Sequence, residues 1–281
     1  MDRDRLIIVR GAGDLATGTI HRLFMAGFPV IALETQHPAA IRRQVSFCEA
    51  VWDKTTEVEG VKAVLAESTA QAFDALDRGM VPVMADPEGA LIKTLKPAVV
   101  VDGILAKKNC GTSIDMAPLT IALGPGFTAG IDVDVVIETK RGHNLGRVIR
   151  EGHACRNTGI PGNIGGYTIE RVIRSPEEGI LKNIAGIGDV VEKGQVLAEI
   201  RMDNGGIVSV AATITGVLRG LLRDGYRVSR AFKIADIDPR KEELQNCFTI
   251  SDKARCISGG VLETICRYFH EKDFHETAQN R

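Results

Sequence analysis

The chain lacks any long uninterrupted run of apolar residues, and this absence narrows the classes of protein to which it can belong. Its N-terminal segment, "MDRDRLIIVRGAGD", holds four consecutive apolar residues, fewer than a signal peptide or a membrane-spanning helix requires. It also lacks an excess of basic residues, because 35 Lys and Arg stand against 36 Asp and Glu. We therefore expect a cytoplasmic protein that binds neither membranes nor nucleic acid.

The sequence has six cysteines but no C-x-x-C pair, so a zinc knuckle is not expected. Scattered cysteines in a chain of 281 residues are typical of reduced thiols buried as small apolar side chains. We find no metal-ligand spacing, no phosphate-binding loop of the Walker type and no Ser/His/Asp motif. The residues therefore predict no metal site, and they leave open whether the protein catalyses a reaction.

The first hundred residues do contain a regular alternation of short apolar runs and amphipathic segments. The pattern predicts helices over 14–26, 68–79 and 86–95, and strands over 6–9, 29–35, 45–52, 81–85 and 98–103. Nearly continuous apolar strands separated by helices are typical of a mostly parallel sheet that is covered on both faces. We therefore predict an α/β, Rossmann-like domain, followed over 104–167 by a glycine-rich extension of tight turns.

An internal repeat follows, in which residues 178–200 align without gaps to residues 215–237. Gly179 matches Gly216, and Lys182 matches Arg219. Two copies of short strands, neither able to bury its apolar face alone, indicate two interlocked halves. The repeat, with "GDVVEKGQVLAEI" in its first copy, resembles the biotinyl/lipoyl-type barrel-sandwich domain. Because the joining stretch 201–213 has no lysine, we expect no covalent biotin or lipoyl group.

These patterns divide the chain into three parts. Residues 1–170 form the predicted Rossmann-like domain with its glycine-rich extension, and residues 171–240 form a small all-β barrel-sandwich hybrid domain. Residues 241–281 hold an apolar stripe at helical spacing, which predicts a C-terminal helix that packs back on the first domain.

The stretch "RGAGDLATG" connects the first predicted strand to the first predicted helix. Its Gly11, Gly13 and Ala16 fit the dinucleotide-binding fingerprint, in which glycines let a phosphate approach the helix N-terminus. Glu34 follows at the end of the second strand, where an acid can accept a hydrogen bond from a ribose hydroxyl. Asp14 favours the opposite interpretation, because it can cap the helix itself. The loop therefore predicts a dinucleotide or related phosphate ligand, with an empty loop as the alternative.

Other candidate residues also follow predicted strands. Asp102 ends a buried strand at the edge where open α/β sheets bind their ligands. Glu138, Arg141 and His143 lie together in "IETKRGH", where they suit acid/base chemistry or anion binding, although a solvated turn has the same composition. Cys110 follows two lysines, whose positive charge would lower a thiol pKa.

Four strings, "GAGDLATG", "ALGPGFTAGIDVDVVIET", "RGHNLGRVI" and "NTGIPG", together resemble one family over nearly the whole chain. This is the accessory protein family of the selenium-dependent molybdenum hydroxylase system. The resemblance implies a bacterial, cytoplasmic protein that acts in the maturation of those hydroxylases, and it assigns no reaction and no role to Cys155. It implies that the following motif positions line a ligand: Gly11, Gly13, Asp14, Gly18, Gly124, Gly126, Glu138, Arg141 and Asn157.

The resulting prediction is a maturation factor that binds a nucleotide or a molybdopterin-type pterin nucleotide in its first domain. Its second domain would present this ligand to a molybdenum hydroxylase client or to other maturation proteins. One alternative is an NAD(P)-dependent oxidoreductase, for which His143 is the available proton donor. The other alternative is a non-catalytic interaction scaffold with an empty Rossmann fold. The sequence leaves the identity of the ligand, the client and a homo-oligomeric state open.

Overall fold

The structure is a computed structural model that describes residues 3–106, 108–156 and 159–279. Its contacts divide the chain into two compact units, each assembled from segments that are far apart in the sequence. Unit 1 comprises Met1–Pro38, Phe47–Asn157 and Ile250–Arg281. Unit 2 comprises Ala39–Ser46 and Thr158–Thr249. The short segment 39–46 and the terminal segment 250–281 thus belong to units other than those of their sequence neighbours.

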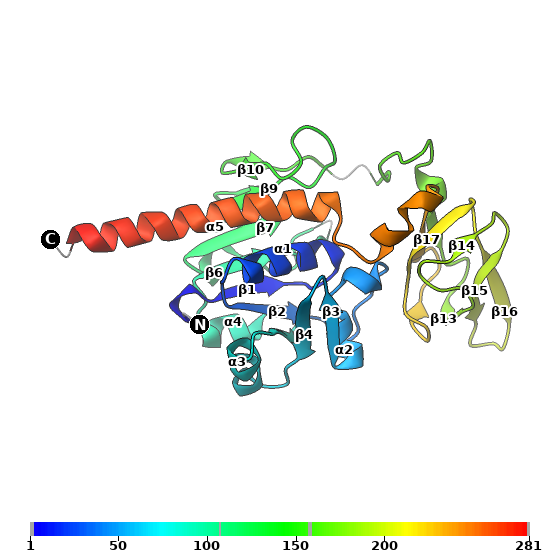
Figure 1. Cartoon of the computed structure of the whole chain (residues 1–281), viewed down its shortest axis with the longest axis horizontal. Helices are drawn as coiled ribbons and strands as arrows, with labels where there is room; N and C mark the ends of the chain where they lie inside the picture. The colour runs from blue at the N-terminus through cyan, green and yellow to red at the C-terminus, as the bar shows by residue number, and fades with distance from the viewer. Residues whose placement is uncertain (1–2, 107, 157–158, 280–281) are drawn as a thin grey trace. The chain divides into compact units, whose positions relative to one another are not determined.

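Unit 1 is built on a nine-stranded mixed sheet with the strand order β10-β9-β7-β6-β1-β2-β5-β4-β3 (Figure 1). The inner strands run parallel, and the antiparallel pairs β3/β4 and β9/β10 lie at the two edges. The strands of unit 1 are β1 (Ile7–Arg10), β2 (Val30–Glu34), β3 (Thr55–Val58), β4 (Val61–Leu65), β5 (Val81–Ala85), β6 (Val99–Asp102), β7 (Leu119–Leu123), β8 (Thr128–Ala129), β9 (Val135–Ile137), β10 (Val148–Ile149) and β11 (Gly152–His153). β8 and β11 form a separate two-stranded sheet.

Helices cover both faces of this sheet (Figure 1). On one face α1 (Asp14–Met25) packs along α5 (Asp252–Gln279), and α5 also contacts β7, β9 and β10. On the other face α3 (Thr69–Asp77) and α4 (Ala90–Leu95) bury a cluster that includes Ile8 and Ile31. The short helix α2 (Glu49–Asp53) contacts β3 and β4. In the part of the chain that the structure describes, no helix is both long and apolar enough to span a membrane.

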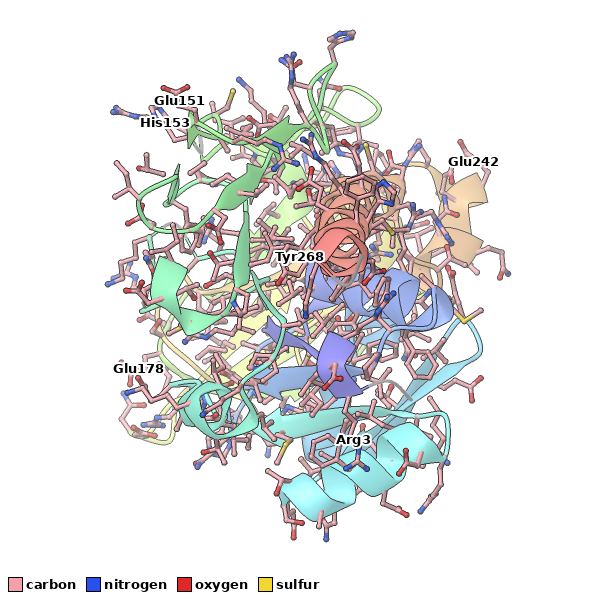
Figure 2. The ribbon with its side chains drawn as sticks, turned by 90° about the vertical axis from the view of Figure 1, so that its left-hand side faces the viewer. Arg3, Glu151, His153, Glu178, Glu242 and Tyr268 are labelled. Atoms are coloured by element: carbon pink, nitrogen blue, oxygen red, sulfur yellow. The ribbon has the colours of Figure 1, made fainter. Side chains whose placement is uncertain are left out.

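Figure 2 looks along α5 from its C-terminal end, and Tyr268 marks this helix. α1 lies directly beside it, as the packing of the two helices requires. A close approach explains the pairing: a Cβ added to Gly18 of α1 would lie 2.7 Å from the Cβ of Ala254. Glycine at this position therefore lets the two helix backbones come together.

Unit 2 consists of two four-stranded antiparallel sheets, with the orders β12-β19-β17-β14 and β16-β15-β13-β18. The two sheets share one apolar core that includes Leu181, Leu218 and Ile237. Its elements are β12 (Val172–Arg174), β13 (Gly179–Asn183), β14 (Val190–Val191), β15 (Val196–Arg201), β16 (Ile207–Ala211), β17 (Gly216–Leu221), β18 (Arg227–Val228), β19 (Lys233–Asp238) and the 3-10 helix η5 (Lys241–Cys247).

The predicted fold class, a Rossmann-like mostly parallel sheet domain plus a barrel-sandwich hybrid domain, is wrong in both parts. The large sheet is mixed because an antiparallel pair of strands lies at each edge. It also departs from the predicted alternation of strands and helices, because β6, β7 and β9 follow one another without an intervening α-helix. Unit 2 is a pair of four-stranded antiparallel sheets, in which β12 and β16 lie outside the two repeat copies. Residues 45–52, which predict a strand, form part of η2 (Arg43–Val45) and α2 instead.

Candidate active site

The glycine loop after β1 is held against a second loop of unit 1. Gly11 has a φ of +92°, and a Cβ there would lie 2.9 Å from the carbonyl oxygen of Gly103. Only glycine combines this left-handed conformation with so close a backbone approach. Gly13, at the N-cap of α1, has nothing within 4 Å of an added Cβ and stays open.

Glu34 ends β2 and fastens this loop to the sheet. One of its carboxylate oxygens accepts a hydrogen bond from the Ala12 N–H at 2.8 Å, and the other accepts one from the Thr35 N–H at 2.7 Å. Both oxygens are thus engaged by backbone donors of the protein itself. The proposed ribose contact of Glu34 stays a prediction.

Two further glycines of the predicted ligand site contact neighbouring segments. A Cβ on Gly124 would lie 2.6 Å from the hydroxyl oxygen of Thr139, and one on Gly126 would lie 3.2 Å from the Lys108 backbone. Both have positive φ angles. These contacts account for glycine at both positions through packing within the chain.

A buried polar network lies where β1 and β6 end side by side. The Thr112 hydroxyl donates to Asp102 at 2.5 Å and accepts from the Arg10 guanidinium at 2.6 Å. The Ile104 N–H also donates to Asp102. Burial raises the pKa of the Asp102 carboxyl, and the hydrogen bonds and the Arg10 charge offset only part of this shift.

Glu138, directly after β9, is buried but surrounded by donors. Its carboxylate accepts hydrogen bonds from the Lys140 N–H at 2.7 Å and from the Cys155 N–H at 2.8 Å. Burial alone would raise the pKa of Glu138, yet the backbone donors and the Cys155 thiol together lower it. Glu138 is therefore an ionised carboxylate that holds the loop carrying Cys155.

Cys155 presents an exposed thiol to this carboxylate. The thiol hydrogen bond to Glu138 and the negative charge of Glu138 raise the pKa of Cys155, and the nearby Lys140 opposes them. The sulfur is consequently protonated at neutral pH. Figure 2 shows the neighbouring Glu151 and His153 at the outer rim of unit 1, so neither converges on the sheet edge.

Lys253, in the first turn of α5, completes this cluster. Burial, followed by the positive charge of Arg141, lowers the pKa of Lys253, while Asp14 and Glu138 oppose that shift. Arg141 itself forms two hydrogen bonds to Asp252, at 2.7 and 3.0 Å. Among the described residues Lys253 has neither a hydrogen bond nor an ion pair closer than 4 Å, which leaves its ammonium group available to a ligand.

Three of the predicted site residues, Asp14, Glu138 and Arg141, therefore lie within electrostatic range of Lys253. Glu34, Asp102 and the glycines Gly11, Gly13, Gly124 and Gly126 lie at other points of unit 1, Gly18 lies in the α1/α5 contact, and Asn157 lies outside the described residues. The predicted site residues include neither Cys155, to which no role is assigned, nor Lys253. Cys155 follows Glu138 by only 17 residues, so a connection of that length can bring the two residues together. No sequence pattern indicates that Lys253 lies near either of them.

No group of three or more His, Cys, Asp or Glu side chains with metal-binding geometry occurs within residues 3–106, 108–156 and 159–279. The fold and the cluster thus define an α/β protein in which an ionised carboxylate follows a strand of the large sheet, a thiol follows β11, and a lysine without a bonding partner lies on α5.

No model of a known protein family matches the chain. The chain is similar to the uncharacterized protein YqeB of Escherichia coli strain K12, with 53% identity over 268 residues. That match covers 95% of this chain but 48% of YqeB, so the chain spans about half the length of this relative. The chain is therefore related to YqeB along nearly its whole length.

Two solved structures are distant matches. The ectoine utilization protein EutE (DoeB) of Ruegeria pomeroyi is 12% identical, with a TM-score of 0.26 over 82% of this chain and 85% of that one. An aspartoacylase family protein from Mesorhizobium loti is 15% identical, with a TM-score of 0.30 over 84% and 85%. Similarity this low transfers no active-site residue to this chain.

The names of these proteins differ from the predicted function. One of these solved structures is named as an ectoine utilization protein, and two others are named as an aspartoacylase family protein and a succinylglutamate desuccinylase/aspartoacylase; these three names mention neither molybdenum nor selenium. The predicted role as a maturation factor for selenium-dependent molybdenum hydroxylases therefore finds no support among these comparisons and is not retained. The name of YqeB assigns no function.

Proposed function

We propose that unit 1 is an acyl-transfer hydrolase that cleaves an amide or ester of a small carboxylic acid. Cys155 is the nucleophile, Glu138 accepts and returns its proton, and Lys253 stabilises the oxyanion. One observation carries the proposal: the backbone N–H of the exposed Cys155 donates to the buried Glu138 carboxylate at 2.8 Å, which raises the pKa of the Cys155 thiol, and Lys253 lies within electrostatic range of the same carboxylate.

The reaction follows from the placement of these groups. The thiol proton moves to the Glu138 carboxylate as the sulfur attacks the carbonyl carbon, and negative charge develops on the carbonyl oxygen. Glu138 then returns the proton to the leaving amine or alcohol as the bond to carbon breaks. Water attacks the resulting thioester, gives one proton to Glu138 and releases the acid, and Glu138 reprotonates the sulfur.

The directions of the two pKa shifts indicate when the Cys155 proton is transferred relative to the attack on the carbonyl carbon. Because the pKa of Glu138 is lowered and that of Cys155 is raised, proton transfer in the resting protein is unfavourable. The thiolate therefore forms only as the carbonyl is attacked, when the positive charge of Lys253 offsets the new negative charge. Lys253 suits this role because Arg141, the neighbouring cation, is already bound to Asp252.

Turnover of a small activated ester, followed together with intact mass, tests the proposal. We expect an acyl group on the wild-type protein that Cys155→Ser lacks, and a loss of turnover in Lys253→Met with the fold intact. Cys266→Ser removes another exposed thiol and should retain full turnover. Equal turnover in wild type and Cys155→Ser would refute the assignment.

A further inference from the structure

Unit 1 contains a cavity of about 1600 Å³ that the proposed hydrolase site does not use. Its lining comes from four segments of the chain, 3–5, 88–98, 113–118 and 268–273, all of which belong to unit 1. The longest of these segments contains α4. Arg3 and Tyr268 are two of the lining residues, and Figure 2 shows both on the side of unit 1 that faces the viewer. The cavity is therefore built within one unit, from segments that the fold brings together.

One wall of the cavity is apolar. Ile92 of α4 is only 2% exposed and belongs to the apolar cluster that α3 and α4 bury. Leu95, Met116 and Ala117 are partly buried and pack against the same cluster, and all four side chains line the cavity. The connection from β6 to β7 has no α-helix among its described residues, so these side chains are left open to the cavity. This wall can hold the apolar part of a ligand.

The remaining lining carries charge of both signs. Five basic and four acidic side chains contribute to it: Arg3, Arg5, Lys93, Lys96, Lys272, Asp4, Glu88, Asp115 and Asp273. Arg5 forms an ion pair with Asp273 at 2.8 Å, and Arg3 forms one at 3.5 Å with an acid outside the cavity. Asp4 and Lys272 also have interaction partners. Two bases and two acids are left, so the available charges balance.

These four residues are Glu88, Lys93, Lys96 and Asp115. Within the part of the chain that the structure describes, their side chains make no hydrogen bond and no ion pair shorter than 4 Å, and all four are exposed. Glu88 precedes α4 and Lys96 follows it. A helix of six residues is about 9 Å long. The cavity therefore has an acid at one end of α4, a base at the other end, and apolar side chains between them.

The backbone at Lys96 indicates that its side chain has a purpose. Lys96 and Lys54 are the C-cap residues of α4 and α2, and both have left-handed backbones, with φ angles of +45° and +67°. Glycine is favoured at such positions because a side chain strains this conformation. Lys54 has an ion pair with Glu67 at 3.6 Å, whereas Lys96 has none and lines the cavity. The strained residue thus supplies an unpaired ammonium group to the cavity.

We propose that this cavity binds an elongated zwitterion, in which an apolar chain joins a carboxylate to an ammonium group. Lys96 binds the carboxylate, Glu88 binds the ammonium group, and Ile92 and its apolar neighbours contact the chain between them. Lys93 and Asp115 add one further charge of each sign. A zwitterion matches this balance of charges, which an anion or a cation alone does not.

Calorimetric titration of the full chain with three ligands of equal carbon number tests the proposal. The ligand 8-aminooctanoate carries both charges, octanoate lacks the ammonium group, and octylamine lacks the carboxylate. We expect 8-aminooctanoate to bind at least about threefold more tightly than either of the others, because each of them loses one ion pair with the cavity.

Variants at the two ends of α4 separate the two contacts. Lys96→Gly should remove the preference for 8-aminooctanoate over octylamine, and Glu88→Gln should remove the preference over octanoate. Lys54→Gly is the matched control, because it makes the same change at a strained lysine outside the cavity and should keep both preferences. Lys96→Gly relieves strain, so its midpoint of thermal unfolding should not fall below that of the wild type. Lys96→Met keeps the strain and should lose the same preference.

Two results would overturn the proposal for the wild type: an affinity for octanoate or octylamine as high as that for 8-aminooctanoate, or no binding of 8-aminooctanoate. A loss in Lys54→Gly equal to that in Lys96→Gly would overturn it too, because general charge would then be responsible. The cavity shares no lining residue with the Cys155 cluster, so these results leave the test of ester turnover unaffected.

Discussion

Asp102 and Glu138 are two buried carboxyl groups that follow strands of the same sheet, with exposed fractions of 1% and 3%. Their pKa values nevertheless shift in opposite directions. Asp102 accepts from one hydroxyl and one backbone N–H, and burial decides its shift. Glu138 accepts from several backbone N–H groups and a thiol, which together outweigh its burial. The donors around a buried acid, rather than its depth, therefore decide whether it stays charged.

The two acids also act on stability with opposite signs. The pKa of Glu138 is lower in the folded protein, so its stabilising contribution is present above the unfolded pKa and is lost as pH falls through the folded pKa. The pKa of Asp102 is raised, so its contribution is greatest below the unfolded pKa and is lost as pH rises through the folded value.

Removal of Glu138 should have the largest effect. Glu138→Ala leaves the N–H groups of Lys140 and Cys155 without their acceptor, and we expect the free energy of unfolding to fall by about 3 kcal/mol or more. Urea unfolding measures this loss. Asp132→Ala is a control on another loop carboxylate of unit 1, one that accepts from the Thr128 N–H. A loss no greater than in that control would mean that Glu138 does not hold the Cys155 loop.

Thr112→Val should be the next most damaging change. Valine keeps the volume of threonine but cannot accept from Arg10 or donate to Asp102, so two buried groups lose a partner. We expect a loss of about 2 kcal/mol in the free energy of unfolding. Thr55→Val is the matched control, because its hydroxyl bonds to a single carbonyl in a partly exposed place. Equal losses in the two variants would show that the Asp102 network stabilises the fold no more than a single, partly exposed hydrogen bond does.

Asp102→Asn should be mild at neutral pH and should depend on pH in a defined direction. The folded protein binds the Asp102 proton more tightly than the unfolded chain does. The free energy of unfolding of the wild type should therefore rise relative to that of the variant as pH falls from the folded pKa to the unfolded one. Glu138→Gln should show the reverse, with the wild type losing its advantage on acidification. Unfolding free energies of both variants across the acidic range measure the two slopes, and slopes of the same sign would contradict the comparison.

Much of unit 1 is predictable from local pattern, because β1, α1, β2, α3, β5 and β6 lie in or close to the ranges that their apolar periodicity indicates. Residues 45–52 were misread because a short apolar run is equally typical of a buried helix. Long-range contacts decide that segment: the Phe47 N–H donates to the Thr17 hydroxyl, and the Cys48 N–H donates to the Ala12 carbonyl. The edge hairpins β3/β4 and β9/β10 likewise depend on strand pairing, which apolar periodicity does not predict.

The candidate site shows the same limit more strongly. Glu138 and Arg141 can be selected from their place after a strand, but Lys253 comes more than 100 residues later, on a helix whose stripe indicates only core packing. The ligand-lining role of the glycines stays a prediction, and contacts within the protein by themselves already require glycine at positions 11 and 18. A glycine-rich sequence indicates that another group approaches the backbone closely, but it does not indicate whether that group is a ligand or a part of the protein.

The last comparison concerns the Cys155 thiol and should give the smallest change. Glu138→Gln removes the negative charge and the carboxylate acceptor that raise the pKa of Cys155, so more thiolate should form at a given pH. We expect alkylation of Cys155 by iodoacetamide to speed up severalfold, although ester turnover falls because the proton acceptor is gone. Peptide mapping of the labelled protein measures the rate at Cys155, and Cys266 serves as the internal standard because it is exposed and distant in sequence. An equal rise at both cysteines would indicate general loosening, whereas slower alkylation of Cys155 would show that Glu138 activates the resting thiol instead of suppressing it.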